Sequence, residues 1–312
     1  MRVGFVILNY QNYSATINCA NTLIEHLRKF VQDPDLDWRI LVLDNGSPNE
    51  SWTRLSNWFE CVETICRGWV TLNRNDQNYG YGKGNNIGLR ELFNEQKCDV
   101  VFVVNSDVTI KWIDLRDLKV LISEAGPACI GVRIIEDGDD QGVIVGGASF
   151  CPISFRSRMV LSNEPRSRGV FYISGAFLGF NRQLFFITNG FNETQFLYFE
   201  ELELFYRVRQ MIRRWPTVSV LDEWIVEHSV GGSTGNAKGG KEKSPLTDYY
   251  SSRGRILFAR EYLSLFILNA VAYNVLLCAQ RATRGRWAGL RAIIIGTFHG
   301  IMGRGGRNAD FH

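Results

Sequence analysis

The chain has 312 residues, of which 45% are hydrophobic and 21% charged, and its formal net charge is +3. This composition is that of a folded globular protein and excludes a disordered or collagen-like chain. The length suffices for one large α/β domain or for a domain with an appendage. The charge is uneven, because residues 251–312 carry nine arginines and no lysine against Glu261 and Asp310. Such a segment favours an anionic partner surface.

The seven cysteines form an odd set without a Cys-x-x-Cys pair, and several lie in apolar runs. This pattern favours reduced, mostly buried thiols. The N-terminal residues run directly into an apolar strand, without the long apolar region and cleavage site of a secretory signal. We therefore expect a cytoplasmic protein.

Short apolar segments rich in β-branched residues alternate with helical segments over the first 110 residues. The predicted strands are residues 3–8, 38–43, 70–72 and 100–104. The predicted helices are residues 15–30, which Ser14 would cap, 52–58 and 89–94. This alternation predicts a mostly parallel α/β sheet flanked by helices on both faces.

Beyond residue 110 the pattern loosens. Further short strands are predicted at residues 130–132, 142–148, 170–173, 218–221 and 224–226. A glycine- and lysine-rich loop follows at residues 231–243, and the chain is helical from Tyr249 onward.

The segment 262–280 has no charged residue and is just long enough to span a bilayer. However, Ser264, Asn269 and Asn274 interrupt it. We therefore favour a helix that packs on the domain or lies at a membrane surface over one that spans the membrane.

Polar side chains follow the predicted strands where each one ends. Asn9 and Tyr10 follow the first strand, Asp44 the second, and Asn105 and Asp107 the fourth. Open α/β sheets bind their ligands at this edge. A carboxylate at Asp44 can accept a hydrogen bond from a pyrimidine N3–H, and one at Asp107 can hold a hard cation against a phosphate. Taken alone, each of these motifs is more often a turn that closes a strand.

The segment 75–88 is dense in glycine and asparagine and includes Asn78, Gly80 and Asn86. Closely spaced glycines let backbone N–H groups approach an anion, and a following helix adds its positive N-terminal end. The spacing is neither that of a P-loop nor that of a dinucleotide-binding fingerprint, so both are disfavoured.

Glu200, Glu201 and Glu203 precede an apolar helical stripe. Helical geometry places Glu201 on the middle of that stripe, with Glu200 and Glu203 well to either side. An inward carboxylate is costly unless it is paired or used, and apolar surroundings raise its pKa toward that of a general base. The alternative, a preference of acidic residues for a helix N-terminus, accounts for Glu200 better than for Glu201.

His228 ends an apolar strand, and a lone histidine is usually structural. It becomes a metal ligand only if the fold brings it beside Asp107.

In their order, these segments resemble family 2 inverting glycosyltransferases of the GT-A fold, in particular the bacterial rhamnosyltransferase-like branch. The matching segments span about residues 3–258 and are 6–10, 42–47, 78–81, 84–88, 105–107, 174–176, 190–193, 196–201, His228, and Tyr249-Tyr250 with Arg253.

The resemblance implies a role for each matched residue. Asp44 would contact the nucleobase, Asp107 would hold Mg²⁺ or Mn²⁺ on the diphosphate with His228, and Glu201 would be the catalytic base. The remaining implied nucleotide contacts are Asn9, Tyr10, Asn78, Gly80, Asn86 and Asn105. The implied sugar or acceptor contacts are Gly175, Ala176 and Glu200. The family usually has Glu-Asp where this chain has Glu200-Glu201, and the middle of its Asp-x-Asp-type motif is often Pro or Asp where this chain has Ser106.

The implied function is metal-dependent transfer of a sugar, rhamnose favoured, from a dTDP- or UDP-linked donor to a glycan or lipid-linked acceptor in cell-surface polysaccharide synthesis. The expected location is the cytoplasm, peripheral at the inner face of the membrane, with no nucleic acid as partner. The implied domains are a GT-A catalytic domain at residues 1–246, with a nucleotide-binding half to about 110 and an acceptor half from 111, and a basic, apolar helical region at 247–312.

Three alternatives remain. The first is a galactofuranosyl- or N-acetylhexosaminyl-transferase of the same fold. The second is a nucleotidyltransferase, which would need a glycine-rich basic signature after the first strand that residues 9–14 lack. The third is a non-catalytic relative that binds nucleotide sugars or polysaccharide, against which the intact Asp44, Asp107 and Glu201 argue.

Overall fold

A computed structural model describes the chain except residues 65, 67, 122–125, 137–142, 162–168, 230–242 and 312. Its centre is one mixed sheet with the strand order β3-β2-β1-β4-β10-β6-β11-β5, and β7 joins β8 and β9 to β6. The strands are β1 (Arg2–Asn9), β2 (Asp37–Asp44), β3 (Val70–Arg74), β4 (Val100–Asn105), β5 (Val108–Trp112), β6 (Ala128–Glu136), β7 (Val143–Cys151), β8 (Arg156–Leu161), β9 (Val170–Ile173), β10 (Phe177–Asn181) and β11 (Thr217–His228).

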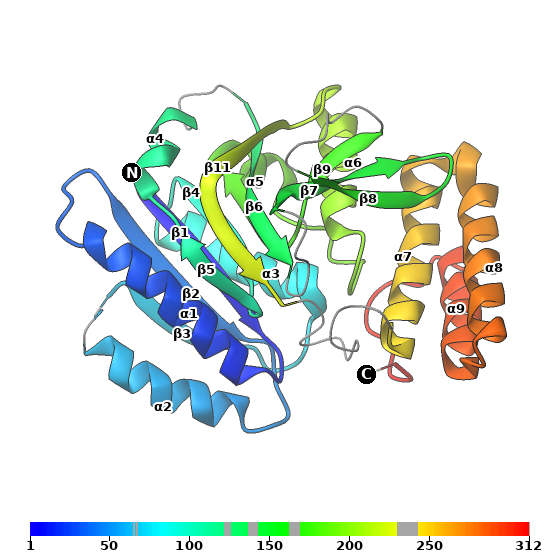
Figure 1. The fold of residues 1–312 in the computed structure, drawn as a ribbon, viewed down its shortest axis with the longest axis horizontal. Helices are drawn as coiled ribbons and strands as arrows, with labels where there is room; N and C mark the ends of the chain where they lie inside the picture. Colours follow the sequence, from blue (N-terminus) through cyan, green and yellow to red (C-terminus); the bar gives the residue numbers. More distant parts are fainter. Residues whose placement is uncertain are drawn as a thin grey trace.

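Helices cover the faces of this sheet, and the C-terminal helices lie beside one end of it (Figure 1). The α-helices are α1 (Tyr13–Leu27), α2 (Ser51–Glu63), α3 (Gly80–Arg90), α4 (Leu118–Leu121), α5 (Arg182–Thr188), α6 (Glu200–Ile212), α7 (Pro245–Tyr262), α8 (Ile267–Thr283) and α9 (Trp287–Ile301). Short helical turns are η1 (Arg28–Phe30), η2 (Glu91–Glu95), η3 (Leu115–Asp117) and η4 (Ser264–Phe266).

The first four strands along the sheet, β3, β2, β1 and β4, are all parallel. β10 then pairs antiparallel with both β4 and β6, β11 runs parallel to β6, and β5 pairs antiparallel with β11. The predicted α/β sheet with flanking helices is therefore confirmed, with antiparallel pairs confined to its second half.

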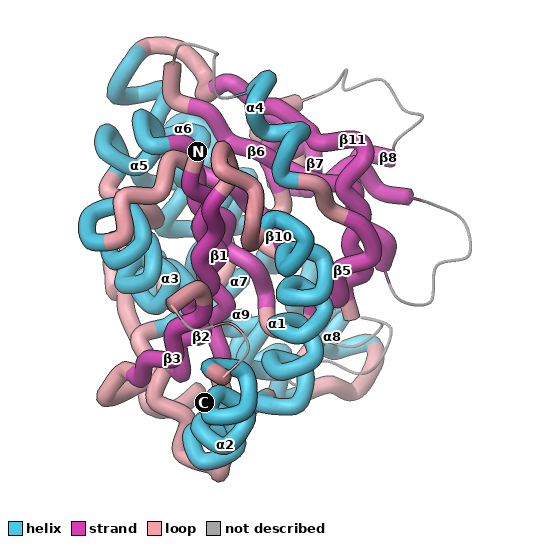
Figure 2. The backbone as a smooth tube through the Cα atoms, turned by 90° about the vertical axis from the view of Figure 1, so that its left-hand side faces the viewer, coloured by secondary structure: helices cyan, strands magenta, loops and turns pink. Residues whose placement is uncertain are grey.

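β1 is buried on both faces because successive side chains of a strand point in opposite directions. Phe5 and Ile7 belong to the core that includes α1, whereas Val6 belongs to the core that includes Leu89. Figure 2 accordingly shows α1 and α3 on opposite sides of β1. The continuous apolar run that predicted a central strand is the consequence of this double burial.

Three predicted boundaries differ from the observed ones. The cap of α1 is Asn12, whose side chain accepts from Ala15 N at 3.5 Å, because the helix begins at Tyr13 and leaves Ser14 inside the first turn. The strands predicted at 218–221 and 224–226 are one strand, β11, in which a register shift absorbs the intervening polar residues. The helix predicted from Leu89 begins at Gly80.

Three C-terminal helices, α7, α8 and α9, pack side by side next to β8 and α6 (Figure 1). Ile256 and Phe258 of α7 share a core with Phe150 of β7 and Leu202 of α6. A buried ion pair joins α7 to α8, because Arg281 donates to both oxygens of Asp248 at 2.7 and 2.8 Å.

The uncharged segment at residues 262–280 is divided, because α7 ends at Tyr262 and α8 begins at Ile267. Among the described residues, Ser264–Thr283 is the one helical stretch whose length and composition would allow it to cross a membrane. In the structure it packs on its neighbours through the buried residues Ala270 and Asn274.

Candidate active site

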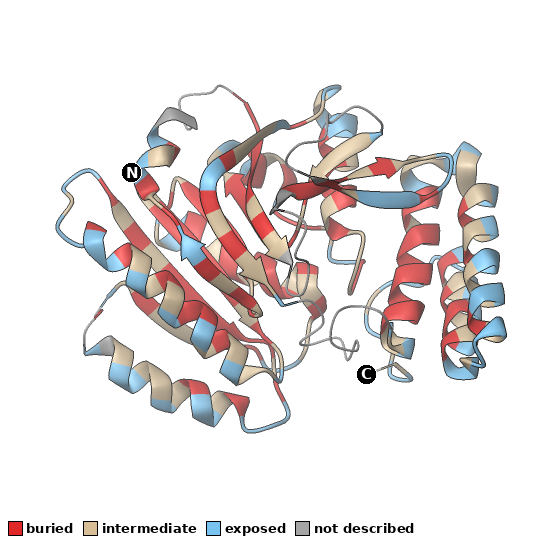
Figure 3. Cartoon of the chain, viewed as in Figure 1, coloured by how far each residue is buried: buried red, intermediate tan, exposed pale blue. Residues whose placement is uncertain are grey.

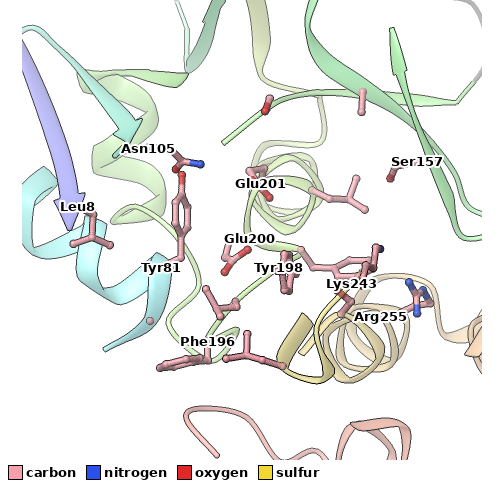
Figure 4. Close-up of a pocket in the computed structure, with 18 of the residues that line it drawn as sticks. Leu8, Tyr81, Asn105, Ser157, Phe196, Tyr198, Glu200, Glu201, Lys243 and Arg255 are labelled. Carbon is pink, nitrogen blue, oxygen red and sulfur yellow. The ribbon is translucent and has the colours of Figure 1, made fainter. Parts of the chain in front are cut away.

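One pocket lies at the carboxyl ends of β1 and β4 and encloses about 540 Å³, a volume typical of small-molecule sites. Its walls come from β1, the β4–β5 turn, the strands β7, β8 and β9, the helices α3, α6 and α7, and the C-terminal tail. It therefore lies where open α/β sheets hold ligands. Figure 4 shows the labelled side chains that line it.

Asp107 and His228 meet beside this pocket. Asp107 occupies the turn between β4 and β5, and β11 pairs with β5 so that His228 stands opposite Val108. His228 Nε2 lies 3.3 Å from Asp107 Oδ1, and both side chains are partly exposed. The fold thus meets the condition on which the assignment of His228 depended. Among the described residues, no group of three or more His, Cys, Asp or Glu side chains is placed to hold a metal ion.

Asp44 lies behind the pocket wall and is fully buried. Its Oδ1 accepts hydrogen bonds from Asn9 Nδ2 at 2.7 Å and from Ser47 Oγ at 2.6 Å, and Arg74 Nε lies 3.3 Å from Oδ2. Neither Asp44 nor Asn9 lines the pocket, whereas Tyr10 does. A direct contact between Asp44 and a nucleobase stays a prediction.

Asn78 and Gly80 line the pocket at the N-terminal end of α3. Asn78 Oδ1 accepts from Gly80 N at 2.8 Å. Asn86 lies elsewhere, because its Nδ2 donates to Phe191 O at 2.9 Å and its side chain is buried. Asn86 therefore holds the 189–193 turn against α3.

The expected anion-binding loop at residues 75–88 is wrong for most of its length. Gly82, Gly84 and Gly88 are part of α3. A Cβ at Gly88 would lie 2.6 Å from Val6 Cγ1, and one at Gly84 would lie 2.9 Å from Leu8 Cδ2. These two glycines let α3 pack closely on β1, so steric contact rather than anion binding explains them.

Glu201 is presented to the pocket by an unusual turn. Tyr198 and Phe199 both adopt left-handed backbone conformations, with φ of 68° and 74°, which is rare for aromatic residues and costs free energy. α6 begins directly after them. Glu201 Oε1 accepts from Gly175 N at 3.1 Å, and burial raises the pKa of Glu201. This direction of the pKa shift agrees with the prediction from the sequence.

The prediction that Glu201 lies on the middle of the inward face of this helix, with Glu200 and Glu203 well to either side, is wrong. Both are more buried than Glu201. Glu203 is held by Arg207 at 3.0 Å and by the hydroxyl of Tyr262 at 2.6 Å, because α7 covers this side of α6. Glu200 Oε1 has no hydrogen-bond partner among the described residues. Burial, and next the charge of Glu201, raise the pKa of Glu200 well above that of an ordinary glutamate.

The turn at residues 174–176 connects three parts of the site. Gly175 N donates to Glu201, Gly175 O accepts from the hydroxyl of Tyr81 at 2.7 Å, and Ala176 O accepts from Asn105 N at 2.9 Å. Tyr81 is a residue of the site that could not be singled out from the sequence. Its only signal was membership of the Asn-Tyr-Gly-Tyr segment, since nothing local to residue 81 indicates a contact with residue 175.

The site also has a cationic end that the sequence analysis missed. Lys243, Arg255 and Arg307 line the pocket on the side of α7 and the C-terminal tail. Arg255 lies two residues beyond Arg253, and periodicity alone did not distinguish the two guanidinium groups.

Known proteins that are similar to this chain in sequence are glycosyltransferases. The sequence profile described as "Glycosyl transferase family 2" matches residues 13–186. A curated relative, the "Low-salt glycan biosynthesis hexosyltransferase Agl10" of Haloferax volcanii, is 28% identical over 139 residues. That match covers 43% of this chain and 44% of the relative, which is less than half of each.

Solved structures of similar fold span most of the chain. One is described as GalNAc-T7 with UDP, GalNAc and Mn²⁺, with a TM-score of 0.58, 17% identity, and coverage of 85% of this chain and 49% of that one. Another is the mannosyltransferase PcManGT from Pyrobaculum calidifontis with GDP-Man and Mn²⁺, with a TM-score of 0.52, 12% identity, and coverage of 96% and 87%. A third, S. aureus TarS residues 1–349 with UDP, has a TM-score of 0.51, 13% identity, and coverage of 90% and 72%. These likenesses establish the fold, and the predicted GT-A fold is confirmed.

Proposed function

This chain belongs to glycosyl transferase family 2, and on that basis we propose that it is a metal-dependent, inverting enzyme of cell-surface polysaccharide synthesis. It moves a sugar, rhamnose favoured, from a dTDP- or UDP-linked donor to a glycan or lipid-linked acceptor. The observation that carries this proposal is that one pocket brings Glu201, with its raised pKa, together with Asn105 and Asp107 at the end of β4. A carboxylate with a raised pKa in a cleft is suited to act as a general base.

Glu201 is the base in this proposal. Its deprotonated carboxylate takes the proton of an acceptor hydroxyl, and the hydroxyl oxygen forms a bond to the anomeric carbon of the donor sugar. The bond from the anomeric carbon to the diphosphate oxygen breaks on the opposite face, so the configuration inverts. The N–H of Gly175 fixes the position of the Glu201 carboxylate, which keeps the base oriented toward the acceptor.

Asp107 and His228 fit a divalent cation by donor chemistry. A carboxylate and an imidazole within 3.3 Å of each other, both partly exposed, suit Mn²⁺ or Mg²⁺ with the other positions open to phosphate oxygens. When bound, the ion would offset the negative charge of the departing diphosphate. Asn105 and Tyr10 line the same end of the pocket and would contact the nucleotide.

The identity of the donor sugar is the finer part of the proposal. Rhamnose is supported by the sequence motifs alone. The structures of similar fold hold UDP, UDP-GlcNAc or GDP-mannose, so an N-acetylhexosaminyl- or galactofuranosyl-transferase is the alternative. The backbone around Asn9 and Asp44 would then hold a different base or sugar without a change in mechanism.

The C-terminal region supports a location at the inner face of the cytoplasmic membrane. α8 exposes an apolar stripe at helical spacing that comprises Leu268, Ala272, Val275, Leu276 and Ala279. α9 exposes Trp287, Ile294 and Phe298, and Figure 3 shows exposed residues along both helices. Exposed apolar side chains in an arginine-rich segment suit an anionic lipid surface. We propose residues 247–312 as this membrane-contacting region and residues 1–246 as the catalytic domain.

The test is a transfer assay on the full chain. Nucleotide sugars are screened with and without Mn²⁺, by thermal shift and then by release of the nucleoside diphosphate. We expect Mn²⁺-dependent stabilisation by a UDP- or dTDP-sugar and turnover that Glu201→Gln abolishes while nucleotide affinity is retained. Full turnover in Glu201→Gln would refute the assignment of the base. The absence of any nucleotide binding would refute the proposed function.

A further inference from the structure

Arg255 is a buried cation on the wall of the pocket. It belongs to α7, its residue is 6% exposed, and its Nη1 donates to Asn274 Oδ1. Its Nε has no hydrogen-bond partner among the described residues. A buried guanidinium with an unsatisfied donor is costly, so a group at this position needs a ligand or a function to explain it.

The surroundings of Arg255 are aromatic. The guanidinium carbon lies 4.5 Å from the ring centre of Tyr273 and 5.7 Å from that of Phe199. Desolvation lowers the pKa of Arg255 to about 10, so it stays charged at neutral pH. Lys243 lies beside Arg255 at this end of the pocket (Figure 4), and Leu246 and Arg307 also line the pocket. This end therefore combines positive charge with apolar walls.

The groups that line the pocket have a definite order. Figure 4 shows Leu8, Tyr81 and Asn105 at one end, Glu200 and Glu201 in the middle, and Lys243 with Arg255 at the other end. If the nucleotide lies at the end of β4, the catalytic carboxylate separates it from Arg255. An in-line displacement places the acceptor on the side of the base opposite the leaving diphosphate. The cationic end is consequently on the acceptor side.

We propose that this cationic end binds a phosphate or diphosphate group of the acceptor, with Arg255 as its main contact and Lys243 as the second. This inference rests on the proposed function, because it takes its orientation from Glu201 and from the donor end. Guanidinium groups bind phosphate through paired, charge-assisted hydrogen bonds. The phosphate can belong to a lipid carrier or to a phosphorylated sugar, and the apolar walls favour the lipid.

The test uses the full chain saturated with UDP and Mn²⁺, so that the donor end is filled. The probes, titrated by calorimetry, are octyl phosphate, glucose 1-phosphate and the uncharged octyl glucoside, and the two octyl compounds are kept below their critical micelle concentrations. We expect octyl phosphate to bind more tightly than octyl glucoside. Arg255→Gln is expected to weaken it by about 10-fold or more, the loss of one charged hydrogen-bonding partner. Arg255→Lys should retain part of the affinity.

Two further variants keep the test decisive. Lys243→Gln changes an exposed residue that lines the pocket and is informative even if Arg255→Gln unfolds. Arg260→Gln removes an arginine of the same helix that does not line the pocket, and it should leave the affinity for octyl phosphate unchanged. All variants should keep the UDP affinity of the parent chain.

The three probes distinguish the two sources of the phosphate. If octyl phosphate binds more tightly than glucose 1-phosphate, the result supports a lipid-linked phosphate. If the two bind equally well, and both more tightly than octyl glucoside, the result supports a phosphorylated sugar. The proposal is overturned if octyl glucoside binds as well as octyl phosphate, if Arg255→Gln and Lys243→Gln both leave the affinity unchanged, or if UDP and octyl phosphate compete. A chain that binds UDP but no phosphate probe would refute this inference and leave the proposed function intact.

Discussion

Gly175 and Glu201 are in direct contact, because the N–H of Gly175 donates to Glu201 Oε1 at 3.1 Å and no side chain lies between them. A Cβ at position 175 would stand 2.1 Å from that same oxygen. The carboxylate can therefore keep its position only while residue 175 is glycine. The two residues are 26 positions apart in the sequence and act as one unit.

Gly175→Ala is expected to displace the Glu201 carboxylate and to lower kcat by about 100-fold, since a shift of about 1 Å in a catalytic group has effects of that size. The affinity for UDP should not change. Glu201→Asp in the Gly175→Ala background shortens the side chain and should recover part of the lost rate. Steady-state kinetics of the two single variants and the double variant measure this, and a Gly175→Ala enzyme with the parent kcat would contradict it.

Glu200→Gln is expected to stabilise the fold at alkaline pH. Burial raises the pKa of Glu200 above its ordinary value of 4.5, so the folded chain retains a proton that the unfolded chain has released. The free energy of unfolding then falls as the pH rises from about 4.5 toward the raised pKa. Glutamine cannot ionise and avoids this loss.

Thermal unfolding between pH 4.5 and 8.5 measures the effect of Glu200→Gln. The Tm values of the two chains should converge at the acidic end and diverge at the alkaline end, with the variant higher. Glu60→Gln, at an exposed position of α2, is the control and should show no such divergence. A Tm difference that is constant with pH would rule out the ionisation of Glu200 as its cause.

Asp107→Asn should remove the Mn²⁺ dependence of UDP binding. For this variant, we expect the affinity for UDP measured in Mn²⁺ to be no higher than the affinity measured in EDTA. His228→Gln should lower the affinity for UDP in Mn²⁺ by about 10-fold or more, because a loss of that size is typical even when a residue that only supports the metal ligands is changed. Calorimetric titration with and without Mn²⁺ is the measurement, and Asp35→Asn, at an exposed carboxylate, is the control. An unchanged Mn²⁺ enhancement in both variants would place the ion elsewhere.

Leu268→Glu and Leu276→Glu should weaken binding to vesicles that contain phosphatidylglycerol. Both side chains are exposed on α8, by 77% and 62%, and burying a leucine is worth about 1.5–3 kcal/mol. Each change should therefore lower the partition coefficient by about 10-fold or more. Met211→Glu, an exposed apolar position on α6, is the control. Co-sedimentation that is equal for all three variants and the parent would exclude α8 from the contact.

The central strands were predictable because their burial leaves a local signature. β1, β2 and β4 are apolar on both faces, and each one ends in a polar residue at the edge of the sheet. The start of α3 was not predictable in this way. Glycine weakens a helix by itself, and only the close contact with Val6 explains Gly88.

The residues of the candidate site fall into the same two groups, those with a local signature in the sequence and those without one. Glu201 and Asp107 follow recognisable segments, so their candidacy could be read from the sequence. The contact of Asp107 with His228 depends on the pairing of β5 with β11, and the burial of Glu203 depends on Tyr262 of α7. Arg255 acquires its position only when α7 packs beside α6 and β7. Such long-range contacts have no periodicity that a single segment could display.

The two ends of the pocket are encoded far apart in the gene. Leu8, Tyr81 and Asn105 lie at one end and belong to the first 105 residues of the chain, while Lys243 and Arg255 lie at the other end and belong to its last quarter. Under the proposed function, changes confined to the C-terminal segment would therefore alter the acceptor and leave the donor sugar unchanged. Chimeras joined between α6 and α7 are the natural way to exchange acceptors among relatives of this fold.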